Sequence, residues 1–304
     1  MAISIGRQLK RAPACLVAAV LCLLVSCQTP VTSVGPGLFY QPLHQDRALS
    51  PAQWQLLLQQ VAAQGYTSLI IQWSQYGDAD FSDSASVLPQ LLALAQQHGI
   101  KLWLGLYADP AYFQSLPPEG AARQRYISQQ LALSQLQWQK LQPLIAPYRQ
   151  RIAGWYLPFE LNDTDLQQPD YVNWLTDSLR QFQLGLKQPL AISAYGNGSL
   201  DTGAFIAALN QLKTSGVTLW LQDGAGAGLI NSAQRRALLA ALPCDIGVIG
   251  ERFRPQQTAT AGFRPASVSE WQAAQQAVKP CHAEFSFSLR YLPLAQGILA
   301  LPQT

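Results

Sequence analysis

The sequence predicts an α/β protein built as one (β/α)8 TIM barrel, and three observations lead to this expectation. Of the 304 residues, 49% are apolar and 12% are charged, so the chain can bury a large core. Short apolar runs alternate with longer amphipathic stretches, which is the pattern of repeated β-α units. Eight such units fit into the part of the chain after the N-terminal signal described below, and a (β/α)8 barrel typically needs about 250 residues.

Eight runs are expected to be strands, because each is short, apolar and bounded by turn-forming residues. In the third run, Trp103 and Tyr107 alternate with leucines, and in the sixth Trp220 does the same, so the polar and aromatic set should face the barrel interior. The predicted strands lie near residues 38–41, 68–73, 101–107, 152–160, 190–195, 217–222, 245–251 and 282–288.

Seven segments between the strands are expected to be helices, because their apolar residues recur at helical spacing. Ser50 is a suitable N-cap with Pro51 in the first turn, and Gly99, Gly185 or a proline ends most of the others. The predicted helices cover residues 51–64, 86–98, 120–142, 169–184, 203–213, 232–242 and 267–278.

An open, doubly wound sheet is the alternative fold, and it commonly has a glycine-rich phosphate turn after the first strand. Here Gly35 and Gly37 precede the first predicted strand, and the glycines at 224, 226 and 228 lack the full dinucleotide spacing. The three histidines lie far apart and suggest neither a metal cluster nor a catalytic triad. No cofactor and no metal are therefore expected.

The N-terminus has the features of a secretory signal over residues 1–26. Arg7, Lys10 and Arg11 precede an apolar run at 15–25 that is too short to span a bilayer. The sequence LVSC that ends at Cys27 resembles the lipobox of bacterial lipoproteins, which implies cleavage before Cys27 and its acylation. Gln28, in place of Asp, implies an anchor in the outer membrane facing the periplasm. A cleaved signal with a chance cysteine is the alternative.

After such cleavage, residues 27–36 would be a lipidated cysteine and a short tether, and 37–304 the barrel. The signal carries three of the 20 Lys and Arg and none of the 17 Asp and Glu, so the mature chain is neutral, with 17 of each. Nucleic acid is therefore an unexpected partner. Cys244 and Cys281 each precede a predicted strand and would form a disulfide in an oxidising compartment, unless both stay free.

Catalytic groups of such barrels stand at the carboxyl ends of the strands, where this chain places aromatic and polar residues. Aromatic faces stack on sugar rings, and amides and carboxylates pair with sugar hydroxyls, so we expect a carbohydrate ligand. The predicted substrate-binding residues are Tyr40, Gln72, Trp73, Tyr107, Asp109, Tyr156, Asn162, Tyr195, Trp220, Gln222 and Asp223.

Two carboxylates are the minimum for glycoside cleavage, and Glu160 and Glu251 end the fourth and seventh predicted strands. In this they resemble the acid/base and nucleophile of retaining (β/α)8 glycosidases. Those enzymes usually have Asn directly before the first glutamate, where this chain has Phe159. Glu251 could instead form an ion pair with a neighbouring arginine, and Glu284 in the eighth strand could be the second carboxylate.

Five segments resemble a bacterial family, domain of unknown function 4434. They are FYQP (39–42), LIIQWSQYGD (69–78), LGLYADPAYF (104–113), GWYLPFELND (154–163) and LWLQDGAGAG (219–228). The likeness runs through most of the mature chain and implies a glycosidase-like barrel, often in lipoproteins.

The first functional hypothesis is a lipid-anchored periplasmic glycoside hydrolase that cleaves a bacterial polysaccharide or oligosaccharide, with retention if active. The second is a non-catalytic saccharide-binding lipoprotein that assists polysaccharide export or envelope assembly. A barrel that only presents a surface to a partner protein is a third possibility.

Overall fold

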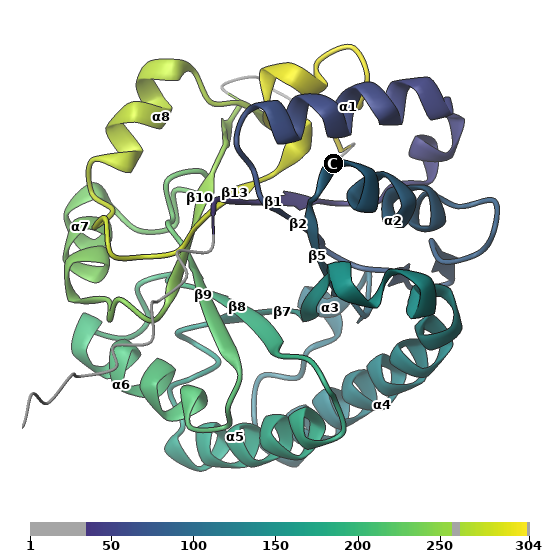
Figure 1. Cartoon of the computed structure of the whole chain (residues 1–304). Coiled ribbons are helices and arrows are strands. Elements are labelled where there is room, and N and C mark those ends of the chain that lie inside the picture. Colours follow the sequence, from purple (N-terminus) through teal and green to yellow (C-terminus); the bar gives the residue numbers. More distant parts are fainter. Residues whose placement is uncertain (1–34, 257–261, 303–304) are drawn as a thin grey trace, which may run out of the picture. The chain divides into compact units, whose positions relative to one another are not determined.

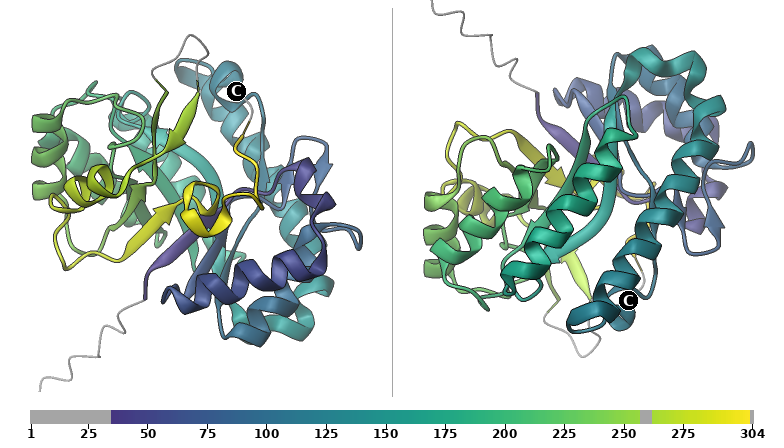
Figure 2. Two further views of the ribbon diagram at one scale, coloured as in Figure 1. Left: turned by 90° about the horizontal axis from the view of Figure 1, so that it is seen from above. Right: turned by 90° about the horizontal axis from the view of Figure 1, so that it is seen from below.

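The computed structural model describes residues 35–256 and 262–302. The predicted signal, Cys27 and most of the tether lie outside these residues. The predicted (β/α)8 barrel is confirmed: eight parallel strands close into a ring, in the order β1-β13-β10-β9-β8-β7-β5-β2. Figures 1 and 2 show the helices outside this ring.

All eight barrel strands coincide with predicted runs, because each run combines strand-forming residues with flanking turn residues. In chain order they are β1 (Gly37–Tyr40), β2 (Ser68–Ile71), β5 (Lys101–Gly105), β7 (Ile152–Asn162), β8 (Leu190–Tyr195), β9 (Thr218–Gln222), β10 (Gly247–Glu251) and β13 (Glu284–Phe287).

Seven of the α-helices in the described chain are the predicted ones, and the short α3 is an addition. The helices are α1 (Pro51–Ala63), α2 (Val87–His98), α3 (Tyr112–Ser115), α4 (Gly120–Ile145), α5 (Pro169–Leu184), α6 (Thr202–Lys213), α7 (Ser232–Ala241) and α8 (Val268–Gln275). After β13 the described chain continues in two 3-10 turns, η3 (Leu289–Tyr291) and η4 (Pro293–Ala295). Two more 3-10 turns, η1 (His44–Ala48) and η2 (Ala146–Arg151), follow β1 and α4.

The helix ends follow from local chemistry. Ser50 caps α1 by accepting from the backbone N–H of Gln53, whose side chain accepts in return from the N–H of Ser50. Gly99 ends α2 with φ of 75°, a left-handed conformation that favours glycine.

Five further short strands lie in the connections at the carboxyl-terminal face of the barrel. In the connections after β2 and β5, β3 (Gln75–Tyr76), β4 (Ala79–Asp80) and β6 (Tyr107–Ala108) form a small sheet. After β10, β11 (Phe253–Pro255) and β12 (Phe263–Pro265) form an antiparallel pair. These additions build up the face on which a barrel carries its site.

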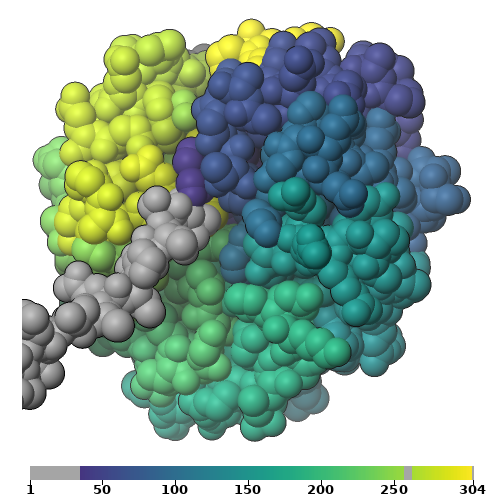
Figure 3. Space-filling view, in the orientation of Figure 1, coloured from purple at the N-terminus to yellow at the C-terminus, as the bar shows by residue number. Residues whose placement is uncertain are grey.

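Aromatic and aliphatic side chains fill the barrel interior, so the ring is a packed core. The rings of Tyr156 and Trp220 stack at 5.6 Å, and Phe39 meets both edge-on. The alternation predicted for the third and sixth strands is confirmed, since Trp103 and Trp220 belong to this inner cluster. In the space-filling view, atoms largely occupy the ring that is open in the ribbon (Figure 3).

Strand β7 carries a bulge that decides where Glu160 points. Leu157 pairs with Ile192 but Glu160 pairs with the next residue, Ser193, so Pro158 and Phe159 are extra residues in β7. Ser193 faces inward, because its hydroxyl lies 2.7 Å from that of the core residue Tyr156. The bulge therefore turns Glu160 towards the inside of the barrel at its carboxyl end.

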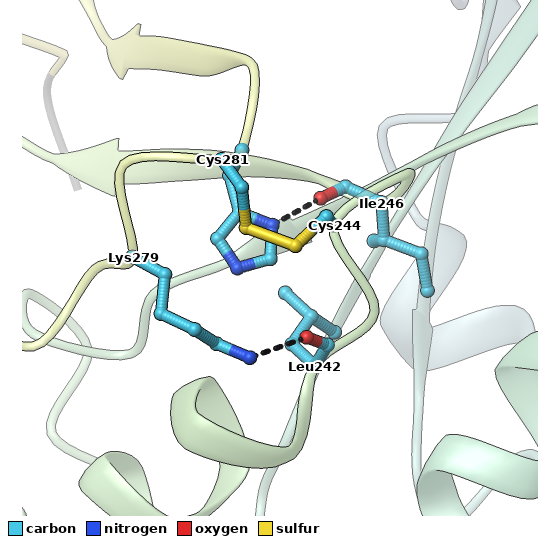
Figure 4. The surroundings of a disulfide bond; sticks show 6 residues. Leu242, Cys244, Ile246, Lys279 and Cys281 are labelled. Atoms are coloured by element: carbon cyan, nitrogen blue, oxygen red, sulfur yellow. Dashed lines mark hydrogen bonds between the residues drawn. A yellow bond between two sulfur atoms is a disulfide. The ribbon is translucent and has the colours of Figure 1, made fainter.

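Cys244 and Cys281 form the expected disulfide, with their Cα atoms 5.4 Å apart (Figure 4). The bond joins the segments that lead into the paired strands β10 and β13. Beside it, His282 Nδ1 lies 2.9 Å from the carbonyl oxygen of Ile246. Within the described residues, no helix is both long and apolar enough to cross a membrane.

Candidate active site at the carboxyl end of the barrel

Glu160 projects inward from the end of β7 and is only partly exposed. The side-chain amide of Gln72, which follows β2, donates to Glu160 Oε1 at 3.2 Å. Gln222, at the end of β9, offers a second side-chain hydrogen bond. Three strands far apart in the sequence thus bring one carboxyl and two amides together.

The pKa of Glu160 is raised above its ordinary value, because burial withdraws the carboxylate from water. The amides of Gln222 and Gln72 oppose this rise, since they stabilise the charged form. No charged side chain in the described chain contributes to the shift. Glu160 is therefore a carboxylic acid with an increased tendency to hold its proton.

Three tyrosines, Tyr76, Tyr156 and Tyr195, lie around Glu160. Burial is the largest cause of the raised pKa of each, and the charge of Glu160 raises it further. Tyr156 forms the floor. Tyr195 ends β8, and its hydroxyl accepts from Asn162 Nδ2 at 3.2 Å. Tyr76, in the small sheet after β2, also feels the charge of Asp109. Tyrosine side chains thus lie around the acid, and the ring of Tyr76 stacks on that of Trp73.

The segment after β5 supplies a further polar group. Asp109 Oδ2 accepts from the hydroxyl of Tyr126 on α4 at 2.8 Å, and Asp109 Oδ1 accepts from the N–H of Ala111. Tyr107 is half-buried nearby, and its pKa is raised by burial and by the charge of Asp109. These two predicted residues therefore lie together on the connection between β5 and α4.

Glu251 ends β10, but its side chain is only 1% exposed. Glu251 Oε2 accepts from the backbone N–H groups of Gly226 and Ala227, while Oε1 has no hydrogen-bond partner in the described chain. Burial and then the charge of Asp223 raise the pKa of Glu251 to about 8. At neutral pH this carboxyl is therefore protonated and covered by the loop that follows β9.

Asp223 also stabilises this loop. Asp223 Oδ2 pairs with Arg235 at 2.6 Å, and Oδ1 accepts from the N–H groups of Ala225 and Glu251. Asp223 is 2% exposed, so this residue, which was predicted to bind sugar, instead supports the loop from behind. We call residues 223–228 the β9 loop.

The side chains of Tyr40 and Trp73 also lie outside the predicted substrate-binding site. The Tyr40 hydroxyl donates to Asp46 at 2.7 Å, and its ring packs edge-on against Trp54 of α1. Trp73 donates from Nε1 to the carbonyl oxygen of Pro42. Both side chains point to the layer between strands and helices, because each follows an inward-facing neighbour along its strand.

Phe159 and Glu284 have definite positions outside the site as well. Phe159 packs outward against Tyr112, so the residue before Glu160 does not face a ligand. Asn162 occupies the next inward position after Glu160 in β7. Glu284 begins β13 and is exposed at the amino end of the barrel, which excludes it as the second carboxylate.

Sequence reasoning did not assign Tyr76, Tyr126 and Ser193 to the site. Tyr76 follows directly on a predicted strand end, and Ser193 lies two residues before Tyr195 on the same face, so alternation could have indicated both. Tyr126 lies on α4, where only a tertiary contact brings it to Asp109. Within residues 35–256 and 262–302, no group of three or more His, Cys, Asp or Glu could hold a metal ion.

Comparisons with known proteins agree with this architecture. The uncharacterized protein YbcH of Escherichia coli K12 is 32% identical over 291 residues, which cover 91% of this chain and 96% of that protein. A solved structure from Bacteroides thetaiotaomicron, named a "putative alpha-L-fucosidase", has 15% identity and a TM-score of 0.61, covering 84% of this chain and 88% of its own. The catalytic domain of a Paenibacillus polymyxa β-amylase has 9% identity and a TM-score of 0.46, with 84% and 92% covered.

At 15% identity, the likeness to the Bacteroides structure shows a shared barrel fold and no activity. The sequence pattern of one family matches residues 36–296, which is nearly the whole described chain. The resemblance expected from the five segments is thus confirmed. This chain belongs to the family described as domain of unknown function DUF4434.

Proposed function

We propose that this protein is a lipid-anchored periplasmic glycoside hydrolase that acts on a bacterial polysaccharide or oligosaccharide, with Glu160 as its general acid. One observation carries the proposal: a desolvated carboxyl with a raised pKa faces inward at the end of β7, among amides and tyrosines. General acids of glycosidases have this character, because they must hold a proton at neutral pH.

The step assigned to Glu160 is a proton transfer. The neutral carboxyl donates its proton to the glycosidic oxygen as the bond from that oxygen to the anomeric carbon breaks. The leaving sugar departs with the proton as its new hydroxyl. The oxygen of a water molecule then bonds to the anomeric carbon, and Glu160, now a carboxylate, takes the proton that this water loses. The amides of Gln72 and Gln222 stabilise the charge of Glu160 meanwhile.

The surroundings suit a carbohydrate. Tyr76 and Tyr195 offer ring faces and hydroxyls, and Asn162 offers an amide on the same inward face of β7. The barrel likeness to a structure named as a fucosidase supports the same substrate class.

Glu251 is the proposed second carboxylate, and its environment sets a condition on that role. A nucleophile must be ionised and must reach the anomeric carbon. Glu251 is protonated at neutral pH and lies beneath Gly226 and Ala227. It could act only after the β9 loop had moved.

This burial of Glu251 favours a second candidate function, a saccharide-binding lipoprotein without turnover that assists export or envelope assembly. The ring around Glu160 would then bind the sugar, with Glu251 only holding the β9 loop.

The anchor is proposed from Cys27 and its surrounding lipobox-like sequence. Several acyl chains would give firm attachment, whereas one chain binds a membrane only marginally. The tether would join the barrel at the start of β1, which is the amino end of the ring, whereas Glu160 lies at the carboxyl end.

The test is to incubate the full lipoprotein, in detergent, with a panel of periplasmic and exported bacterial polysaccharides, and to detect new reducing ends by mass spectrometry. Glu160→Gln should reduce the rate about 10²- to 10⁴-fold, the usual contribution of a general acid. Glu284→Gln is the matched control and should keep the wild-type rate, because Glu284 lies at the other end of the barrel.

Four results would decide between the functions. An unchanged rate in Glu160→Gln would remove Glu160 as the acid. Loss of product in Glu251→Gln as well would support the carboxylate pair. Saccharide binding without product from any polymer would favour the binding lipoprotein, and neither binding nor product would overturn both candidates.

A further inference from the structure

One large cavity lined by described residues lies outside the ring around Glu160. It has a volume of about 590 Å³ and is bounded by the β9 loop, the start of α7, Arg254 of β11 and the length of α8. Helices α7 and α8 are neighbours on the same side of the barrel (Figure 1). Ligand sites commonly have volumes of about 300–1,000 Å³, so this cavity can hold one or two sugar rings.

Two of the charged groups at the cavity are neutralised within the protein. Arg235 pairs with Asp223, and both side chains are nearly buried. Glu270 accepts from both terminal nitrogens of Arg264 at 2.8 and 2.7 Å. These two ion pairs contribute no net charge to the cavity wall.

Two further arginines line the cavity without an acidic partner. Arg254 donates to the backbone carbonyl oxygens of Glu251, Phe253 and Glu270, and within residues 35–256 and 262–302 it forms no ion pair with a carboxylate. Arg236, on the exposed side of α7, has no hydrogen bond or ion pair in the described chain. The cavity therefore has an excess of two positive charges.

Arg254 is held in place more firmly than a surface arginine. Its three carbonyl contacts come from the end of β10, from β11 and from α8, so the guanidinium is oriented before any ligand arrives. Preorganised donors bind anions with a smaller entropy cost than mobile ones. Arg236 is free to close over a ligand from the opposite wall.

The remaining wall is mostly apolar and small. Ala273 and Ala274 of α8, Ala277 just after this helix, and Ile230 line it, with Gly224 and Gly228 from the β9 loop. Such a wall accepts the carbon face of a sugar ring, whereas the arginines would bind an acidic substituent.

We propose that this cavity is a binding site for an acidic sugar, one that carries a carboxylate or a phosphate, with Arg236 and Arg254 contacting the anionic group. The site is separate from the ring around Glu160 and does not depend on hydrolysis there.

The experiment is isothermal titration calorimetry of the full lipoprotein, in detergent at low salt, with glucuronate, glucose 6-phosphate, glucose and inorganic phosphate. We expect one acidic sugar to bind more tightly than both glucose and inorganic phosphate. Arg236→Gln should weaken that binding about tenfold, the usual effect of losing one charge-assisted hydrogen bond, and Arg236→Lys should retain part of it.

Arg125→Gln is the matched control, because Arg125 is exposed on α4 away from the cavity. It should bind as the wild type does, and so should Glu160→Gln, which separates this site from the proposed active site. The proposal fails if neither acidic sugar binds, if glucose or inorganic phosphate binds as tightly, or if Arg236→Gln has no effect.

Discussion

Strand β10 ends in a glutamate and β7 carries one two residues before its end. Burial makes both carboxyls harder to ionise, yet they lie in different surroundings. Glu160 is partly exposed and meets the side-chain amides of Gln72 and Gln222. Glu251 is 1% exposed and meets the backbone N–H groups of the β9 loop.

A raised pKa alone therefore does not identify a catalytic group. Desolvation is the largest cause of the shift at both positions. We call the end of β7 open, because Glu160 there is still partly exposed to solvent. The end of β10 is closed by a loop, so its acid stabilises that loop in the resting structure.

The largest expected effect comes from removing Asp223, which supports the β9 loop at the closed end of β10. Asp223→Ala should lower the free energy of unfolding by about 3–5 kcal/mol, because it leaves the guanidinium of Arg235 nearly buried without its partner. Glu160→Gln, at the open end, should change it by less than about 1 kcal/mol. Urea unfolding measures both, and a loss below about 1 kcal/mol in Asp223→Ala would contradict the closed-end description.

A smaller effect is expected from Gly226. A Cβ at this position would lie 2.7–2.8 Å from Phe253 and from the Cβ of Glu251, so the β9 loop cannot keep its place with a larger residue. Gly226→Ala should therefore lose about 1–3 kcal/mol of stability, as overpacked sites do.

Gly185→Ala is the matched control for that variant. Gly185 follows α5 with φ of −75°, and a Cβ there would have its nearest contact at 3.4 Å. The control should be neutral or slightly more stable. Equal stabilities of the two variants in thermal unfolding would show that the loop is not packed on Glu251.

Most of the fold could be predicted because strand and helix signals are local. Each barrel strand is a short apolar run, and alternation identified Trp103 and Trp220 as interior residues. The same alternation explains three predicted ligands that point elsewhere. Tyr40, Trp73 and Asp223 each directly follow a residue that faces inward, so they face outward.

The parts of the site that could not be predicted depend on contacts between distant segments. Nothing local in β7 shows that Pro158 and Phe159 form a bulge, because that depends on the register with β8. The sequence of β10 predicts an inward Glu251, but its cover comes from the loop after β9. Whether a carboxyl at a strand end is open or closed is therefore a tertiary property.

The effect that separates the two glutamates most directly is the pH dependence of Glu251→Gln. The pKa of Glu251 is raised from 4.5 to about 8 in the folded protein. Between these values the unfolded chain releases the proton and the folded chain keeps it, so wild-type stability should fall as pH rises through this window.

Glutamine mimics the protonated acid and cannot ionise, so Glu251→Gln should lack that decrease. The variant should match the wild type near pH 4.5 and become more stable than it by pH 8.5, by up to about 5 kcal/mol, because each unit of pKa shift corresponds to about 1.4 kcal/mol. Urea midpoints at the two pH values measure the difference. Glu160→Gln should show the same direction with a smaller amplitude, because water still reaches the open end. If the wild type and Glu251→Gln respond to pH alike, the carboxyl of Glu251 is ionised in the folded protein, and the end of β10 is as open as the end of β7.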